Sequence, residues 1–556
     1  MLINKYKNKY LIPVLTHNLP NVYKKPIILL FLIFSHWTFA QSDCQFTFKY
    51  TPSTQKGVIN WKQFPDFSLP FKIVYTGPRF KDSLQLPLKH GFSHLANFTS
   101  ADIDLPQKNR AILWGGVASI AGQPWYEIES PWKNNLQKYR AKWANDMRGM
   151  ADIFRDTQGK AMPNLDILML DVEREIPSDV GIRFLKADTT LPAQYRKLSD
   201  LDFTERYKKD LAKLYAEPIK YLKNNAIPSA TNFASYSDAP IKNQEFPLNY
   251  TWQDWQTTDR VLNYYMIDTL TKKVGGEFYY QNTFLAPSAY FCYEYGLLKE
   301  YPNVAYQLFQ VEANVARSDK DIMLFEWLSY NKCQTNSNYG YNKPIKKHLI
   351  EAQAIMPFFS GAKGIWLWEN PITPDSLNYS AYETYINSLY RLSQFKDFFT
   401  GNYRLVIPKS AYQHFKDRDA VWRGVVKGNE ILVAAVNEFA NDGETTDLTI
   451  SYGGWSEKIQ LKGKETFLCK FVLPDLPLNY TLYPNPSQGK FTFECYGNDF
   501  LTGSLKIIDA LGREVFFQQM AGGTRKKEFD ISWTSGIYFL YYTEGQKVIN
   551  KKIIID

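Results

Sequence analysis

The sequence lacks several features that would define a membrane, disulfide-rich or metal-binding protein. The apolar run from Ile27 to Phe34 is much shorter than the roughly 20 residues that a membrane span needs. Five cysteines are scattered without a C-x-x-C pair, which excludes a disulfide scaffold. Cys292 and Cys333 are one candidate pair, and buried thiols are the other reading. The six histidines show no ligand spacing with a carboxylate, so we predict no metal site.

Other absences exclude further classes of function. No G-x-S-x-G motif marks a serine hydrolase. No Gly-rich phosphate loop follows the first predicted strand, so a doubly wound dinucleotide-binding sheet and its cofactor are not expected. No repeat of 20–50 residues suggests an adhesin. Five of the net nine positive charges fall in residues 1–40, and no basic stripe predicts a nucleic-acid partner.

The first 40 residues have the pattern of a secretory signal peptide. Lys24 and Lys25 precede the apolar run, and small residues stand before a cleavage position after Ala40. The mature chain would begin at Gln41. A lipoprotein would need a cysteine directly after the cut, and Cys44 lacks the small apolar residues that usually precede one.

Residues 71–400 alternate between strand-like and helix-like segments, which predicts a parallel sheet with crossover helices. Eight strands and their helices in about 330 residues fit an α/β fold, the (β/α)8 TIM-like barrel. The predicted strands are Phe71–Thr76, Phe92–Phe98, Ala111–Val117, Ile167–Glu173, Ile227–Ser235, Gly276–Thr283, Ile322–Leu328 and Gly364–Glu369. The clearest helices are Trp132–Arg155, Phe203–Asn224, Tyr301–Ala316 and Ile345–Phe359.

The remaining segments complete the predicted domain order. An N-terminal segment, 41–70, precedes the barrel. A small antiparallel β-sandwich, 401–472, follows it, with strands at 420–425, 430–435, 445–452 and 457–461. A Pro-marked linker, 473–478, leads to a C-terminal β-sandwich at 479–556.

The C-terminal segment carries a distinctive set of turns. Residues 483–489 read Y-P-N-P-S-Q-G, residues 509–513 read D-A-L-G-R, residues 536–538 read G-I-Y, and a basic strand follows. The prolines of the Y-P-N-P motif favour an extended backbone at the start of the domain. Gly512 supplies the positive φ that the turn at 509–513 requires. In this order the motifs closely resemble the C-terminal sorting domain of the type IX secretion system. The resemblance implies a Gram-negative bacterium of the Bacteroidetes group, transit through the periplasm, export across the outer membrane by that machinery, and release or attachment at the cell surface.

The fourth predicted strand ends in carboxylates. Asp171 and Glu173 follow a nearly continuous apolar run and share one face of the strand. Chemistry in barrels lies at the carboxyl ends of the strands, and glycoside hydrolysis needs an acid and a second carboxylate. The alternative is an ion pair with Arg174 or a capped strand end.

Other predicted strand ends add further candidates. Glu326 follows the seventh strand's apolar run, and it is either catalytic or a buried carboxylate held by a barrel cation. Aromatic and polar side chains at strand ends could bind a sugar. The predicted substrate-binding residues are Trp366, Trp368, Trp327, Asn232, Tyr236 and Tyr280.

At these residues the chain resembles two kinds of barrel glycoside hydrolase. In the large retaining superfamily, Glu173 would be the acid/base and Glu326 the nucleophile, although Val172 stands where an Asn is usual. In the chitinase type, D-x-x-D-x-D-x-E is matched by Asp166, Asp171 and Glu173, with Met169 in place of the second Asp. There Glu173 would be the acid, Asp171 would orient an N-acetyl group, and Trp366 or Trp368 would floor the sugar.

We therefore predict an exported glycoside hydrolase that acts on an extracellular polysaccharide or glycoconjugate without a cofactor. Its partners would be that glycan and the secretion machinery. The alternative is a non-catalytic glycan-binding surface protein on a barrel scaffold. Both readings place the protein outside the cell or on its surface.

Overall fold

The computed structural model divides into two compact units, Met1–Gln45 and Phe46–Asp556, and the fold below is that of the second. The signal-peptide prediction lies outside the described residues. The structure describes residues 44, 46, 48–54, 57–79, 85–118, 130–155, 163–173, 177–225, 231–242, 261–268, 271, 273–292, 302–331, 343–368, 379–474, 479–496, 503–520, 526–544 and 547–556.

Two parallel sheets form the centre of the large unit. One has the order β2-β1-β7-β6, and the other has the order β3-β4-β5. Their strands are β1 (Lys72–Tyr75), β2 (His94–Leu95), β3 (Ala111–Trp114), β4 (Ile167–Leu170), β5 (Asn232–Ser235), β6 (Met323–Trp327) and β7 (Gly364–Trp368).

Single parallel bridges connect the two sheets. Leu95 pairs with Arg110 between β2 and β3. The segment 285–288 pairs with Tyr236 after β5 and with Ile322 and Phe325 at β6. The parallel order is therefore β1, β2, β3, β4, β5, residues 285–288, β6 and β7, and β7 pairs with β1.

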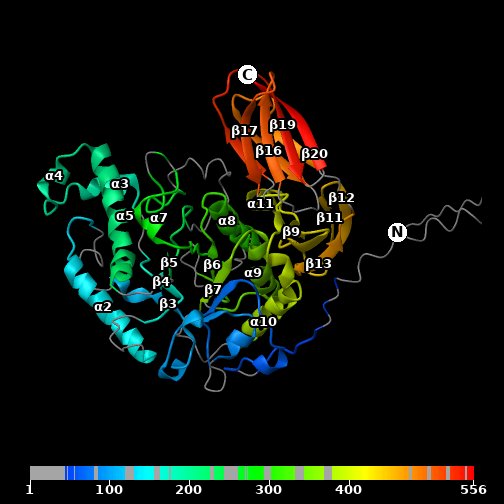
Figure 1. Ribbon diagram of the computed structural model, residues 1–556. Helices are drawn as coiled ribbons and strands as arrows, with labels where there is room; N and C mark the ends of the chain where they lie inside the picture. The colour runs from blue at the N-terminus through cyan, green and yellow to red at the C-terminus, as the bar shows by residue number, and fades with distance from the viewer. Residues whose placement is uncertain are drawn as a thin grey trace, which may run out of the picture. The chain divides into compact units, whose positions relative to one another are not determined.

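Helices lie on the outside of these strands (Figure 1). The long ones are α2 (Leu136–Ile153), α5 (Asp200–Asn224), α8 (Asn303–Val315), α9 (Lys347–Phe359) and α10 (Ser380–Ser393). Asn135 and Ser199 cap α2 and α5 by accepting from the backbone N–H groups of Lys138 and Asp202. The four helices predicted most clearly are confirmed. The shorter helices are α3 (Asp179–Leu185), α4 (Ala193–Arg196), α7 (Glu277–Gln281), α11 (Ala411–Asp417), and 3-10 turns at Trp61–Gln63, Leu86–Lys89, Ser100–Asp102, Gln107–Asn109, Gly115–Ala118 and Lys396–Phe399.

The predicted strand Gly276–Thr283 is wrong, because residues Glu277–Gln281 form helix α7. Gly276 enters the helix with φ +92°, a conformation that a β-branched or aromatic residue would resist. Phe278 and Tyr279 are buried, so the apolar run that suggested a buried strand belongs to a buried helix. The other seven predicted strands overlap the observed ones, and residues 285–288 take the sixth position.

Side chains from the strands pack into a separate apolar cluster. Each strand except β2 contributes one or two residues to it, as alternation along a strand requires, and Ala96 directly after β2 contributes one more. The buried members are Val74, Ala96, Ala111, Ile167, Met169, Ala234, Phe284, Ala286, Met323, Phe325 and Trp366. The intervening strand residues pack instead against the helices.

The predicted sandwich strands after residue 400 are confirmed. One sheet has the order β13-β10-β9-β8, with β8 (Arg404–Val406), β9 (Val421–Lys427), β10 (Glu430–Val436) and β13 (Phe467–Val472). A separate hairpin joins β11 (Thr445–Tyr452) to β12 (Trp455–Lys462). Val425 and Leu432 belong to the same hydrophobic core as Ile355 of α9.

The C-terminal segment forms two antiparallel sheets around its own core. The first is β14-β15-β18, with bounds Asn479–Tyr483, Lys490–Tyr496 and Lys526–Asp530. The second is β17-β16-β19-β20, with bounds Glu514–Met520, Gly503–Asp509, Gly536–Glu544 and Lys547–Ile555.

The structure separates the two alternatives for the cysteines: buried thiols are wrong for three of them and confirmed for one, and the Cys292–Cys333 pairing itself stays a prediction. Cys44, Cys292 and Cys469 are disulfide-bonded, whereas Cys495 is a buried thiol. Cys333 lies outside the described residues. Within the described ranges, no helix is both long and apolar enough to cross a membrane.

Candidate active site

Asp171 lies just beyond the carboxyl end of β4. Its backbone N–H donates to the carbonyl of Trp114 at 3.2 Å, which extends the β3–β4 pairing to this residue. Burial and the negative charge of Glu173 raise the pKa of the Asp171 carboxyl to about 7. Its Oδ1 atom is buried without a hydrogen-bond partner among the described residues. The Asp171 carboxyl can therefore bind or release a proton near neutral pH. Its Oδ1 atom can also accept a hydrogen bond from a bound molecule.

Glu173 follows with a backbone φ of +45°, in the left-handed region that a residue with this side chain rarely adopts. Such strained positions are concentrated at functional sites. Burial raises the pKa of the Glu173 carboxyl, although the residue remains exposed to solvent at its surface. An accessible carboxyl with a raised pKa can act as a general acid.

Two tyrosines lie near this carboxyl pair. Tyr236 follows β5, and its hydroxyl donates to Ser288 Oγ at 3.3 Å. Tyr290 follows the 285–288 segment and hydrogen-bonds Tyr236. Burial and the charges of Glu173 and Asp171 raise the pKa of Tyr236 to about 12 and that of Tyr290 well above its usual value. Both therefore stay neutral phenols, with the Tyr236 hydroxyl donated to Ser288 and the Tyr290 hydroxyl donated to Tyr236.

Aromatic side chains continue from Tyr290 along the strand ends. Its ring centroid lies 5.8 Å from Trp327 and 5.8 Å from Trp368, and these two tryptophans lie 5.0 Å apart. The ring of Tyr236 lies 4.5 Å from Phe325. The carboxyl pair thus adjoins a set of aromatic rings of the kind that stack on sugars. The structure brings together Asp171, Glu173, Tyr236, Trp327 and Trp368 from the predicted set.

Trp366 lies deeper than predicted. Its side chain is fully buried, stacks on Phe325 and donates to Thr76 Oγ1 at 2.8 Å. It fills the space inside the strands and has no exposed surface to offer a sugar. Trp368, two residues further along β7, is partly exposed instead.

Glu326 does not lie with the other two carboxylates. It accepts from Gln307 Nε2 of α8 at 2.7 Å and from the Tyr385 hydroxyl of α10 at 3.3 Å. Phe325 belongs to the cluster inside the strands, so alternation turns Glu326 toward the helices. Burial raises its pKa well above the usual range. The predicted pairing of Glu173 with Glu326 is therefore corrected, because the two side chains occupy opposite faces of the strands.

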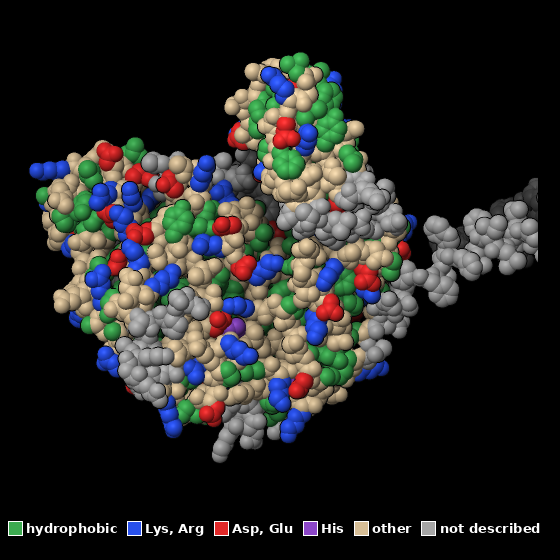
Figure 2. Space-filling model, viewed as in Figure 1, with side chains coloured by type: hydrophobic (Ala, Val, Ile, Leu, Met, Phe, Trp, Pro, Cys, Tyr) green, Lys and Arg blue, Asp and Glu red, His purple; other side chains and the backbone are tan. Residues whose placement is uncertain are grey.

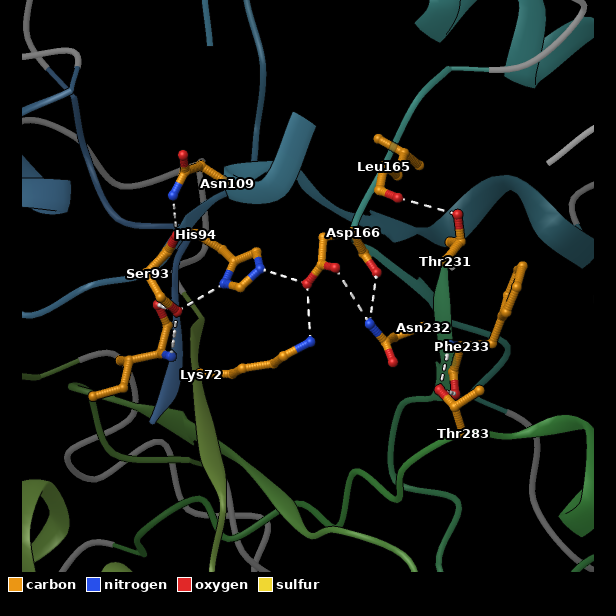
Figure 3. Close-up of polar contacts among 11 residues, drawn as sticks. Lys72, Ser93, His94, Asn109, Leu165, Asp166, Thr231, Asn232, Phe233 and Thr283 are labelled. Carbon is orange, nitrogen blue, oxygen red and sulfur yellow. Dashed lines mark hydrogen bonds and ion pairs between the residues drawn. The ribbon is translucent and has the colours of Figure 1, made fainter. Parts of the chain in front are cut away.

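Asn232 lies at the other end of the strands, where β5 begins (Figure 3). Its amide nitrogen donates to the backbone carbonyl of Asp166 at 3.1 Å. Asp166, which precedes β4, also pairs with Lys72 at 2.9 Å and with His94 at 2.8 Å. This polar network ties the starts of β1, β2, β4 and β5 together, remote from the carboxyl ends that hold Asp171.

Tyr280 also falls outside the site. It lies on α7 and is 67% exposed. The prediction failed because this segment is a helix and not the sixth strand. Conversely, sequence reasoning missed Tyr290 and Ser288, since the true sixth strand position is a short irregular segment that begins at residue 285.

The residues that the structure describes contain no group of three or more His, Cys, Asp or Glu side chains that could hold a metal ion. His94 pairs with Asp166, and the ring nitrogens of His90 lie near the backbone carbonyls of Leu86 and Phe64.

Comparison with known proteins identifies one part of the chain. Residues 481–556 match the family described as the secretion system C-terminal sorting domain, which confirms the resemblance drawn from the turn motifs. No curated protein sequence matches the chain.

Several solved glycoside hydrolases align with the chain at low similarity. An endo-beta-1,4-mannanase double mutant from Cellulomonas fimi is 10% identical over 82% of this chain and 80% of that chain, with a TM-score of 0.30. A glycoside hydrolase family 30 subfamily 8 xylanase from Clostridium acetobutylicum is 12% identical over 88% and 97%, with a TM-score of 0.29. A beta-galactosidase from Rahnella sp. R3 is 11% identical over 60% and 58%, with a TM-score of 0.35. Scores this low carry no conclusion about activity.

Proposed function

We propose that the chain is an exported glycoside hydrolase whose strands close into a (β/α)8 barrel and whose site is built on Asp171 and Glu173. The observation that carries the proposal is the carboxyl pair at the end of β4, coupled in charge and adjoining aromatic rings. Two such carboxyls beside a sugar-stacking surface suit cleavage of a glycosidic bond. The substrate is a polysaccharide or glycoconjugate outside the cell.

In the proposed reaction Glu173 protonates the leaving glycosidic oxygen and then helps water to attack. Burial raises the pKa of Glu173, which favours the protonated form that a general acid needs. Asp171 lies beside it and stabilises the positive charge that develops on the sugar ring or on a neighbouring substituent. Tyr236 and Tyr290, hydrogen-bonded to each other beside the carboxyls, limit the orientations that the substrate can take. Trp368, which is partly exposed, stacks against a sugar face, and the buried Trp327 packs beside it.

Asp171 replaces Glu326 as the second carboxyl of the proposed site. Glu326 is enclosed by Gln307 and Tyr385 on the helix side of β6. An assisted mechanism, in which Asp171 orients a reacting group of the substrate, is therefore favoured over a Glu326 nucleophile. Asp171 as the second carboxyl favours the chitinase-type mechanism, in which the substrate is an N-acetylated sugar.

The test measures reducing-sugar release by the full mature chain on N-acetylglucosamine polymers and on plant and fungal glucans. We expect Glu173→Gln to lose about 10²- to 10⁴-fold in kcat, the usual contribution of a general acid. Glu326→Gln is the matched control and should keep turnover within about threefold, because this buried side chain contacts Gln307 and Tyr385 on the helix side of β6 and an amide has nearly the same shape.

Two outcomes would overturn this assignment. Full activity in a folded Glu173→Gln variant would remove Glu173 from the mechanism. Loss of turnover in Glu326→Gln, with folding intact, would restore the retaining reading. Saturable glycan binding without any release by the wild-type chain would favour the non-catalytic glycan-binding protein.

A further inference from the structure

The residues that define the sorting motifs are occupied by internal structural roles. Asp509 Oδ1 accepts from the backbone N–H groups of Leu511 and Arg513 at 2.9 Å each, and Arg513 Nε donates to Asp509 Oδ2 at 2.7 Å. Gly512 completes this turn with φ +82°. The D-A-L-G-R motif therefore encodes a turn, held by Asp509, from which the side chains of Leu511 and Arg513 extend into solvent.

The other motif residues behave in the same way. Asn485 donates to the carbonyl of Lys552 at 2.8 Å and accepts from the N–H of Ile554 at 2.9 Å, which ties the Y-P-N-P turn to β20. A Cβ on Gly489 would lie 2.3 Å from the carbonyl oxygen of Ile531. Tyr538 of the G-I-Y motif is buried, and its hydroxyl donates to the carbonyl of Thr534 at 2.8 Å. The motif thus specifies the fold, so the recognition surface must be sought among other residues.

The outer face of the β17-β16-β19-β20 sheet is unusually apolar. Its inner face packs into the domain core through Leu505, Ile507 and Leu540. On the opposite face Phe517 is 51% exposed and Phe539 is 37% exposed. Solvated faces of antiparallel sheets are normally polar, and exposed apolar patches mark interaction sites. Figure 2 shows hydrophobic side chains at the surface of this domain beside Lys or Arg side chains.

The strand register makes these side chains one continuous surface. Phe539 is paired with Ile508 on one side and with Lys552 on the other. Lys506 is paired with Phe517 on one side and with Tyr541 on the other. Residues directly opposite on antiparallel strands point to the same face. We call this surface the outer sheet face. Its exposed or half-exposed members are Ser504, Lys506, Ile508, Glu514, Phe517, Gln519, Ile537, Phe539, Tyr541, Thr543, Val548, Asn550, Lys552 and Ile554.

The outer sheet face carries two lysines and one carboxylate. Lys506 and Lys552 lie between the aromatic and aliphatic side chains. Glu514 is paired with Ile508 across the bulge between β16 and β17, so this carboxylate also lies on the face, 3.6 Å from Lys506. A partner that covers this face should therefore present apolar side chains with carboxylates around them.

We propose that the outer sheet face is the surface by which the tail docks onto a protein component of the secretion machinery, and that this component presents an apolar patch with acidic residues at its edge. The sorting-domain match supplies the requirement for a protein partner. The face supplies exposed aromatic anchors and complementary charge, the two features that dominate binding energy and specificity at protein interfaces. This proposal is independent of the glycosidase assignment.

The experiment follows export of the full chain in a Bacteroidetes host with the type IX system, as the extracellular or surface fraction against the periplasmic fraction on immunoblots. The test variants are Phe517→Ser with Phe539→Ser, and Lys506→Glu with Lys552→Glu. Loss of two aromatic anchors should reduce export by about tenfold or more, since each hot-spot residue contributes about 1 kcal/mol or more.

Matched controls change the same residue types away from this face. Leu511→Ser alters a turn residue that is 78% exposed, and Lys490→Glu alters a lysine whose side chain is 78% exposed on the other sheet. Both should export normally. Thermal denaturation of each purified chain shows whether a variant has lost its fold, and the lysine pair keeps the test valid if the aromatic pair does not fold.

Normal export of both folded test variants would overturn the proposal, and so would equal loss in the controls. Two further measurements address other occupants. Sedimentation should give a monomer, and a dimer abolished by Phe539→Ser would assign the face to a second copy. Vesicles of anionic phospholipid should not bind the full chain, and Phe539-dependent binding would assign the face to a membrane surface.

Discussion

The Asp171 and Glu173 carboxyls form a coupled pair, because each charge disfavours ionisation of the other. The raised pKa of Glu173 and the pKa of about 7 at Asp171 mean that the pair still holds a proton just below neutral pH. At higher pH both groups are ionised and no acid remains to protonate the leaving oxygen.

We therefore expect kcat/KM to fall as pH rises through about 7, the value at Asp171. Asp171→Asn removes the charge interaction between Asp171 and Glu173. Turnover should then fall by about 10²-fold, and the fall of kcat/KM at high pH should begin at a lower pH than in the wild type. Initial rates from pH 4 to 9 on a soluble substrate test this. An unchanged alkaline limb in Asp171→Asn would show that another group sets it.

The buried Glu326 carboxyl should make the protein less stable as pH rises, whereas an ion-paired carboxyl makes a protein more stable as pH rises. Burial holds its native pKa well above the unfolded value of 4.5. The native state therefore binds this proton more tightly, and the free energy of unfolding decreases as pH rises above about 4.5. Glu326→Gln should melt at a higher temperature than wild type at pH 9 and show a smaller difference at pH 5. Equal differences at both pH values would contradict it.

Asp166 should make the protein more stable as pH rises, which is the reverse of the effect of Glu326. Burial alone would raise its pKa, but hydrogen bonds from His94 and Lys72 outweigh burial, and the pKa is lowered from 3.8. Its stabilising contribution is present above that value and is lost as pH falls through the lowered native pKa. Asp166→Asn should cost about 1 kcal/mol at pH 7, since Lys72 is half exposed, and nearly nothing at pH 2. Chemical denaturation at both pH values measures the difference.

At the scale of elements, helix α8 is held at both ends by residues of the segment 401–472. The Glu438 carboxylate accepts from the backbone N–H groups of Val304 and Ala305 at 2.9 Å each, at the first turn of the helix. Near the other end Glu312 pairs with Arg423 of β9 at 2.6 Å, and both are buried. The helix dipole and a buried ion pair thus attach α8 to another sheet.

We expect Glu438→Ala to lower the free energy of unfolding by about 2 kcal/mol, because two buried N–H groups lose a charged acceptor. Glu430→Ala is the matched control: its ion pair with Lys470 is partly exposed, so the cost should stay below about 0.5 kcal/mol. Urea denaturation measures both. A cost for Glu438→Ala no larger than the control's would mean that water replaces the carboxylate without loss.

At the scale of the whole molecule, residues 401–472 share one hydrophobic core with the helices around the strands. Val425, Leu432 and Val436 pack in the same cluster as residues of α8 and α9. The segment is therefore a structural support for the α8 and α9 side of the fold, and not a module attached by a linker.

A chain that ends at residue 400 should consequently aggregate, because its α8 and α9 faces lose their buried partners. A chain that ends at residue 474 keeps this core and should melt near the wild-type temperature. Soluble yield and thermal denaturation of the two truncated chains test whether the helices α8 and α9 need residues 401–472 to fold. A cooperative transition in the shorter chain would show that the sandwich folds separately.

The sequence alone determined the parts of this protein that depend on local patterning. Strands such as Ile167–Leu170 and helices such as Lys347–Phe359 follow from apolar runs and periodicity. The sorting domain follows from turn residues with fixed conformational demands, such as Gly512 and Asp509. Asp171 and Glu173 could be selected because carboxylates directly follow a buried strand.

Only the tertiary structure decided which side chains meet. Glu326 and Trp366 occupy apolar strands that look suitable in sequence, but alternation and neighbouring helices turn Glu326 outward and packing buries Trp366 beneath the site. Tyr290 reaches Tyr236 from a segment with almost no strand signal. Such contacts depend on the register between segments distant in the chain, which a local pattern does not contain.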